Sequence, residues 1–113
     1  MASPRHLDLG RLGELIAAQF LSRRGARIEG RNVRSGRGEI DLVALIDRRR
    51  VAVEVKSARR ASGTDPRENL DDHKLDMVRR TAAGLDPPIH RIDLITVVLD
   101  GEGAAVRWLR DVV

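Results

Sequence analysis

The chain has 113 residues, of which 42% are hydrophobic and only 2% aromatic, and it carries a formal net charge of +4. It contains no cysteine, which excludes disulfides, thiolate zinc sites and cysteine nucleophiles. Because Phe20 and Trp108 are its only aromatic residues, an aromatic stacking platform for unpaired bases is not expected.

The length predicts a single domain over residues 1–113 with one aliphatic core. Residues 1–10 lack the apolar segment of a secretion signal, and no apolar run approaches the ~20 residues that span a bilayer. We therefore expect a cytoplasmic protein with no membrane partner.

The first half of the chain predicts one helix followed by three strands. Apolar residues recur at helical spacing between a capping Asp8 and Gly25, so a helix is expected from Asp8 to Arg24. Strands are expected at 26–34, 39–46 and 51–57, with turns at 35–38 and 47–50. Such short turns predict an antiparallel meander.

The second half predicts a crossover helix and two more strands. A polar loop is expected at 58–70, a helix at 71–83, a strand at 89–99, a hairpin turn at 100–103 and a strand at 104–109. The intervening helix is long enough for a right-handed crossover, which would make the third and fourth strands parallel. The predicted fold class is α/β, with a mixed β-sheet flanked by helices in the order αβββαββ.

Arginine supplies most of the positive charge, because nineteen arginines accompany only two lysines, Lys56 and Lys74. A guanidinium matches phosphate oxygens in a two-point geometry, so nucleic acid, DNA in particular, is the expected partner. A general preference for arginine explains the same composition equally well. The lysines are more informative, since an ammonium shifts its pKa readily when buried and suits a chemical site.

Charged residues on two neighbouring predicted strands indicate a reaction centre. Glu54 and Lys56 lie two residues apart and therefore share one face of their strand. If the strand of Asp41 pairs with theirs, the carboxylates of Asp41 and Glu54 converge, and such oxygen ligands suit Mg²⁺ or Mn²⁺. Lys56 would then orient or deprotonate a water, or neutralise a phosphate oxygen, as phosphodiester hydrolysis requires.

The same residues also have a plainer interpretation. A glutamate and a lysine two apart on the solvent face of a strand are common, and alone they are more often structural than catalytic. Asp41 favours the functional interpretation, because aspartate is depleted in strands and here lies between Ile40 and Leu42. A carboxylate buried there needs a partner.

Three segments together resemble the YraN family: Gly38-Glu-Ile-Asp41-Leu-Val43, Val53-Glu54-Val-Lys56, and Gly13-Glu14 in the first helix. This family of small bacterial proteins, regarded as candidate endonucleases, is similar to the PD-(D/E)xK nuclease superfamily and specifically to archaeal Holliday junction resolvases. The resemblance covers nearly the whole chain. It implies a restriction-endonuclease-like fold and, by analogy with the resolvases, a homodimer that acts on branched DNA.

Carried over to this sequence, the resemblance implies that Asp41 and Glu54 are the acids of the motif and Lys56 its lysine. It also implies that Glu14 completes the metal site, acting through a water. Without the resemblance, Glu14 is more simply an exposed helical acid balanced by Arg11.

Further basic residues are expected to hold nucleic acid: Arg31, Arg34, Arg37, Arg59 and Lys74. Lys74 matches a family lysine, although acids beside it would repel phosphate. Arg48 to Arg50 and Arg60 would join the others in one phosphate-holding rim; the alternative is an ordinary solvated surface.

Two other features concern an ion pair and the loop after Lys56. Arg91 and Asp93 are expected to form a cross-strand ion pair. The family's tyrosine late in the first helix is Phe20 here, and the loop after Lys56 has no bulky aromatic, so we do not expect that loop to stack on bases or position the substrate. Its Gly63 and polar neighbours predict that it is disordered without DNA.

Our leading hypothesis is a Mg²⁺- or Mn²⁺-dependent endonuclease that cuts DNA, either branched or single-stranded. An alternative is a catalytically inactive nucleic-acid-binding module with the same fold. A third, with least support, is a protein-interaction adaptor that uses an exposed strand or the C-terminal Val112-Val113.

Overall fold

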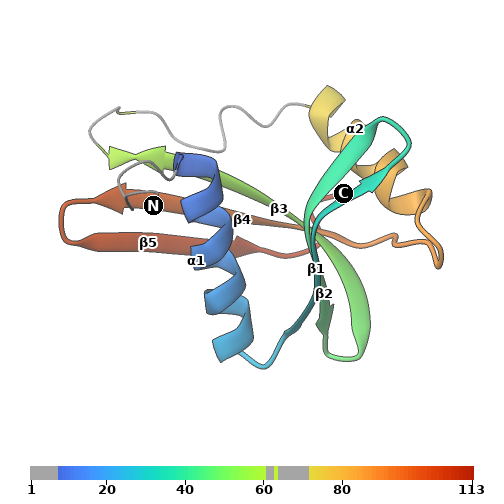
Figure 1. Cartoon of the computed structure of the whole chain (residues 1–113), viewed down its shortest axis with the longest axis horizontal. Helices are drawn as coiled ribbons and strands as arrows, with labels where there is room; N and C mark the ends of the chain where they lie inside the picture. The colour runs from blue at the N-terminus through green and yellow to red at the C-terminus, as the bar shows by residue number, and fades with distance from the viewer. Residues whose placement is uncertain (1–7, 61–62, 64–71) are drawn as a thin grey trace, which may run out of the picture.

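Within residues 8–60, 63 and 72–113, which the computed structural model describes, the chain forms two helices and a five-stranded sheet (Figure 1). The elements, in chain order, are α1 (Leu9–Arg23), β1 (Arg27–Ser35), β2 (Gly38–Ile46), β3 (Arg49–Arg59), α2 (Asp72–Ala83), β4 (Ile92–Asp100) and β5 (Gly103–Leu109). The predicted α/β order is therefore confirmed. Asp8 caps α1 as expected, since its carboxylate accepts a hydrogen bond from the Arg11 amide at 2.7 Å.

The sheet has the order β1-β2-β3-β4-β5 and is mixed. Strands β1, β2 and β3 form the predicted antiparallel meander, β3 and β4 are parallel, and β4 and β5 form an antiparallel hairpin. In Figure 1, α1 crosses strands β3 to β5, and α2 lies beside the turn that joins β1 to β2. This arrangement is compatible with a restriction-endonuclease-like fold.

Several strand ends differ from the prediction. β3 begins at Arg49 because Arg49 and Arg50 still pair with the end of β2, and it continues to Arg59 because Ala58 and Arg59 pair with β4. The prediction of a loop from residue 58 was therefore wrong for its first two residues. β4 begins only at Ile92, since the Ile89 amide donates a hydrogen bond to the carbonyl of Ala82 at the end of α2. The expected loop disorder concerns residues 61–62 and 64–71, which lie outside the described residues.

The sheet buries side chains on both faces, in two separate clusters. Leu42 and Ala44 of β2 pack with Val53 and Val55 of β3 in the cluster beneath α1. Val43 and Ala52 instead belong to the cluster beneath α2, together with Val78 and Ala82 of the helix. Because side chains alternate along a strand, Glu54 and Lys56 follow Ala52 on the α2 face.

Two glycines let the helices approach the sheet closely. A Cβ atom at Gly13 would overlap the Ser57 side chain on β3, and one at Gly38 would overlap the Thr81 side chain on α2. Each glycine precedes a residue of interest, because Glu14 follows Gly13 on α1 and Asp41 lies three residues beyond Gly38 on β2. Close packing therefore fixes both acids relative to the sheet.

Asp93 is fully buried and anchors the last part of the chain. Arg91 forms a two-point ion pair with it, at 2.9 Å for each bond, and the Trp108 ring nitrogen donates to it at 2.8 Å. The amide of Asp111 donates a fourth hydrogen bond, at 2.9 Å. The predicted pair exists, but it joins residues two apart in one segment, so the cross-strand expectation was wrong. No helix among the described residues is both long and apolar enough to cross a membrane.

Candidate functional site

The carboxyl groups of Asp41 and Glu54 meet where β2 and β3 separate. The pairing of these strands runs from Ile46↔Arg49 to Leu42↔Val53, so Asp41 and Glu54 occupy the next opposed positions. Beyond this point a side chain replaces the main chain as the partner of β3, because the Val55 amide donates to Oδ2 of Asp41 at 2.8 Å. A hydrogen bond also joins the Asp41 and Glu54 side chains.

Glu54 is the more buried acid of the pair. It is 6% exposed, whereas Asp41, which we expected to be buried, is only partly covered. Burial, the charge of Asp41 and the hydrogen bond with Asp41 together raise the pKa of Glu54 to about 8, although the charges of Lys56 and Lys74 oppose the shift. Near neutral pH Glu54 therefore keeps its proton beside Asp41, so the site favours an added positive charge.

Both lysines of the chain lie beside this acid pair. Lys56 Nζ is 3.5 Å from Oε1 of Glu54. Burial lowers the pKa of Lys56 most, and its contact with the Lys74 side chain lowers it further, while Glu54 opposes the shift. Lys74, in the first turn of α2, also lowers the pKa of Glu54, which places its ammonium within electrostatic reach of the acid pair.

Glu14 approaches the pair from α1 but does not join it. Its Oε1 accepts a hydrogen bond from the Asn32 side chain at 3.1 Å. Burial raises the pKa of Glu14, and the charges of Asp41 and Glu39 contribute, although the Asn32 hydrogen bond opposes them. Within residues 8–60, 63 and 72–113, no three histidine or acidic side chains are arranged to hold one ion. The structure thus brings Asp41 and Glu54 together and leaves Glu14 as a neighbour.

The predicted nucleic-acid contacts are distributed over both sides of the sheet. Arg34 lines a hollow with Glu14, whereas Arg37 lies in the β1–β2 turn beside α2. Arg31, opposite Leu42 on β1, and Arg59, at the end of β3, are both exposed.

The expectation of a single arginine rim was wrong. Arg48 to Arg50 lie at the β2–β3 turn, which is the opposite end of β2 from Arg37. Arg50 is engaged there with Glu29 and with the carbonyl of Pro87. Arg60 pairs with Asp100 at the β4–β5 hairpin.

The profile of uncharacterised protein family UPF0102 matches residues 13–97, a stretch that contains Glu14, Asp41, Glu54 and both lysines. The chain belongs to this family, the YraN family. It is 38% identical to a UPF0102 protein of Porphyromonas gingivalis over 108 residues, which are 90% of this chain and 79% of the relative. A UPF0102 protein of Renibacterium salmoninarum is 40% identical over 111 residues, 92% of this chain and 94% of the relative. One from Aquifex aeolicus is 44% identical over 73 residues, 65% of this chain and 68% of the relative.

The predicted site residues did not include Asn32, which contacts Glu14, or Arg107, which lies two strands from Lys56 on the same face of the sheet. Asn32 has a positive φ of 49°, and its side-chain amide donates a hydrogen bond to Glu14. Asparagine tolerates a positive φ better than most residues, so an asparagine within a predicted strand was the signal that the sequence offered. Arg107 lies in register with Thr96, which lies in register with Lys56, so the three share one face of the sheet. That relationship depends on strand order and could not be read from spacing.

The UPF0102 site therefore combines an acid pair that demands positive charge with two ammonium groups that attract negative charge. Asp41 is held by a main-chain amide and Glu54 by its own burial, so the pair is fixed in place before any ligand arrives. A divalent cation and a phosphate are the two ligands that satisfy both halves of such a site.

Proposed function

We propose that this UPF0102 protein is a Mg²⁺- or Mn²⁺-dependent endonuclease that hydrolyses phosphodiester bonds in DNA, in branched or single-stranded regions. The observation that supports this proposal most is the contact between the Asp41–Glu54 acid pair and Lys56, with Lys74 beside them. Preorganised charges of both signs at one point suit a reaction in which charge develops on a phosphate.

The donor set fits a hard divalent cation. Mg²⁺ is usually bound by one or two carboxylates, together with waters and substrate phosphate oxygens, so a complete protein cage is not required. Asp41 and Glu54 would hold the ion, and the raised pKa of Glu54 reflects a proton that the ion would displace. Once bound, such a cation acts as a Lewis acid and lowers the pKa of water.

The remaining residues have separable tasks. Lys56, whose pKa is lowered by burial, is suited to accept a proton from the attacking water or to orient it. Lys74 supplies a second positive charge on the α2 side, which faces phosphate oxygens rather than the metal. Glu14, held by Asn32, assists from the α1 side through a water.

A cleavage screen over single-stranded, nicked, branched and duplex DNA, with RNA counterparts and added Mn²⁺, tests the proposal. Asp41→Asn, Glu54→Ala and Lys56→Ala should abolish cleavage while the folded content, read by circular dichroism, is retained. Glu102→Gln is the matched control, because it removes an exposed acid in the β4–β5 turn. No cleavage by the unaltered protein on any substrate, or equal cleavage by the Asp41→Asn variant, would refute the assignment.

A nucleic-acid-binding module without catalysis is the second candidate. It is favoured by the absence, among the described residues, of three side chains placed to hold one ion. Such a module would bind DNA with undiminished affinity in all three site variants and would show no metal requirement. Its affinity would still fall with salt, since arginine contacts release counterions from phosphates.

A further inference from the structure

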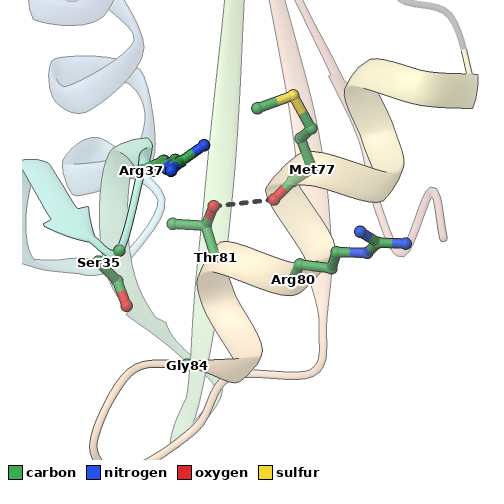
Figure 2. Close-up of a pocket in the computed structure, with 8 residues that line it drawn as sticks. Ser35, Arg37, Met77, Arg80, Thr81 and Gly84 are labelled. Atoms are coloured by element: carbon green, nitrogen blue, oxygen red, sulfur yellow. Dashed lines mark hydrogen bonds between the residues drawn. The ribbon is translucent and has the colours of Figure 1, made fainter.

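A second hollow lies beside the candidate site, between the β1–β2 turn and α2. It has a volume of about 350 Å³ and is lined by residues of the turn, Ser35 to Gly38, and by residues of the helix, including Met77 and Thr81. Figure 2 shows Arg37 reaching from the turn toward Met77, with Thr81 at the floor, where its hydroxyl donates to the Met77 carbonyl. The hollow is therefore walled on two sides and is large enough for a small ligand.

The hollow and the candidate site lie along one continuous surface. Lys74, Met77 and Thr81 follow one another at spacings of three and four residues, so they share one face of α2. On the sheet side, Gly38 lines the hollow at the start of β2, and a Cβ atom there would meet the Thr81 side chain of α2. A ligand that extends from the acid pair along α2 would thus enter the hollow.

The lining has the chemistry of a nucleotide site. Arg37 is exposed and makes no hydrogen bond or ion pair with any described residue, so its guanidinium is available to a phosphate. Met77 is 46% exposed, which is unusual for a large apolar side chain, and a thioether makes favourable contacts with aromatic rings. Arg80 also lines the hollow, but its guanidinium is paired with Asp76 at 3.0 Å.

We propose that this hollow binds one unpaired nucleotide of the strand whose phosphate occupies the candidate site, with Arg37 on its phosphate and Met77 against its base. The inference rests on the proposed function, because it assumes a nucleic acid at the acid pair. An unpaired nucleotide is required, because a base inside a duplex cannot enter a walled hollow. The chain lacks an aromatic stacking platform, and Met77 provides the apolar contact in its place.

Cysteine protection tests the inference directly. The chain has no cysteine, so Met77→Cys introduces a unique thiol. Leu15→Cys is the matched control, because Leu15 is 42% exposed, close to the 46% of Met77, and lies on α1 over the other face of the sheet. Each variant is reacted with a maleimide in the presence of EDTA. The reaction is run on the free protein, on protein saturated with a single-stranded oligonucleotide and on protein saturated with a blunt duplex. Gel shifts measure the bound fraction in each case.

We expect the single strand to slow alkylation at position 77 in proportion to the bound fraction, and to leave position 15 unchanged. The duplex should protect neither thiol. Equal alkylation at position 77 in free and DNA-bound protein would overturn the inference while leaving the nuclease proposal intact, since binding would be proven. A protein that binds no nucleic acid in the gel shift would instead overturn both. If a peptide or a free nucleotide slowed alkylation at position 77 and a single strand did not, the inference of a bound strand nucleotide would also be overturned.

A charge variant gives an independent measurement. Arg37→Ala should reduce the magnitude of the slope of log affinity against log salt for single-stranded DNA by about 0.7, which corresponds to one lost phosphate contact. Arg23→Ala removes an exposed arginine from the end of α1 and should leave the slope unchanged. Identical slopes for the Arg37→Ala variant and the unaltered protein would contradict the assigned phosphate contact.

Discussion

Asp41 and Glu54 lie side by side at the point where β2 and β3 stop pairing, and the less exposed of the two, Glu54, has the strongly raised pKa. The arrangement is costly to the folded protein as long as no cation is present, because a buried carboxyl must either keep a proton or face a second carboxylate. Stability is therefore linked to pH, and the proposed cation site would link it to divalent ions as well.

The metal-free protein should lose stability as the pH rises from about 5 to about 8. In this window the folded state holds the Glu54 proton, since its folded pKa is about 8, whereas the unfolded glutamate, with a pKa of 4.5, has released it. The folded state then binds more protons, so the free energy of unfolding falls with pH, by at most about 1.4 kcal/mol per pH unit for one group. Urea unfolding in EDTA across this range measures the slope.

Glu54→Gln should flatten that slope, and Glu102→Gln should preserve it. The lowered pKa of Lys56 acts in the opposite direction, because the unfolded lysine holds its proton to higher pH, and Glu54→Gln removes the charge that opposes that lowering. A stability that is independent of pH between about 5 and 8 in the unaltered protein would show that Glu54 does not hold the proton.

Divalent ions should stabilise the fold, most strongly at pH values near and above 8, where Glu54 is ionised. A ligand that binds only the folded state adds about 2.7 kcal/mol at a concentration a hundredfold above its Kd. Thermal unfolding with Mn²⁺ and with EDTA measures this difference. It should vanish for Asp41→Asn and Glu54→Gln and persist, reduced, for Glu14→Gln, because Glu14 lies outside the pair. Equal stabilisation of all three variants would place the ion elsewhere.

Gly13→Ala should destabilise the protein by about 1–3 kcal/mol, since its Cβ would overlap the Ser57 side chain. Ser57→Ala alone should be neutral or stabilising, because the buried Ser57 hydroxyl has no hydrogen-bond partner within the described residues. The double variant should lose less free energy of unfolding than the sum of the losses in the two single variants, as expected of residues in contact. A double-mutant cycle in urea measures the coupling, and strict additivity would show that the two side chains do not meet.

The sequence predicted most of the elements because the patterns that specify them are local. Alternation and short turns predicted β2 and β3, and helical spacing between Asp8 and Gly25 predicted α1 to within a residue at each end. The errors occurred where pairing decides the ends of strands: β3 is longer because parallel β4 gives Ala58 and Arg59 partners. Such pairing depends on strand order, which residue spacing does not contain.

The candidate site shows the same division. The shared face of Glu54 and Lys56 follows from a spacing of two, and the opposition of Asp41 follows from pairing β2 with β3 across a short turn. The greater burial of Glu54 could not be predicted, because it depends on packing between elements that are far apart in the sequence. The separation of Glu14 from the pair likewise depends on the packing of Gly13 against Ser57.

Asp93→Asn should destabilise the protein by roughly 3–5 kcal/mol without any direct effect on the candidate site, since it leaves the half-buried Arg91 without its counter-ion. It would also weaken the hydrogen bonds that Trp108 and the Asp111 amide donate to the carboxylate, which hold β5 and the last residues to β4. Chemical unfolding measures the loss, and Trp108 fluorescence, which comes from the only tryptophan, reports the local change.

The control is Asp47→Asn, because Asp47 is exposed and its ion pair with Arg110 is long at 3.8 Å. This change should alter the free energy of unfolding by less than about 1 kcal/mol. Equal effects of the two changes would show that the Asp93 cluster does not anchor the C-terminal strand.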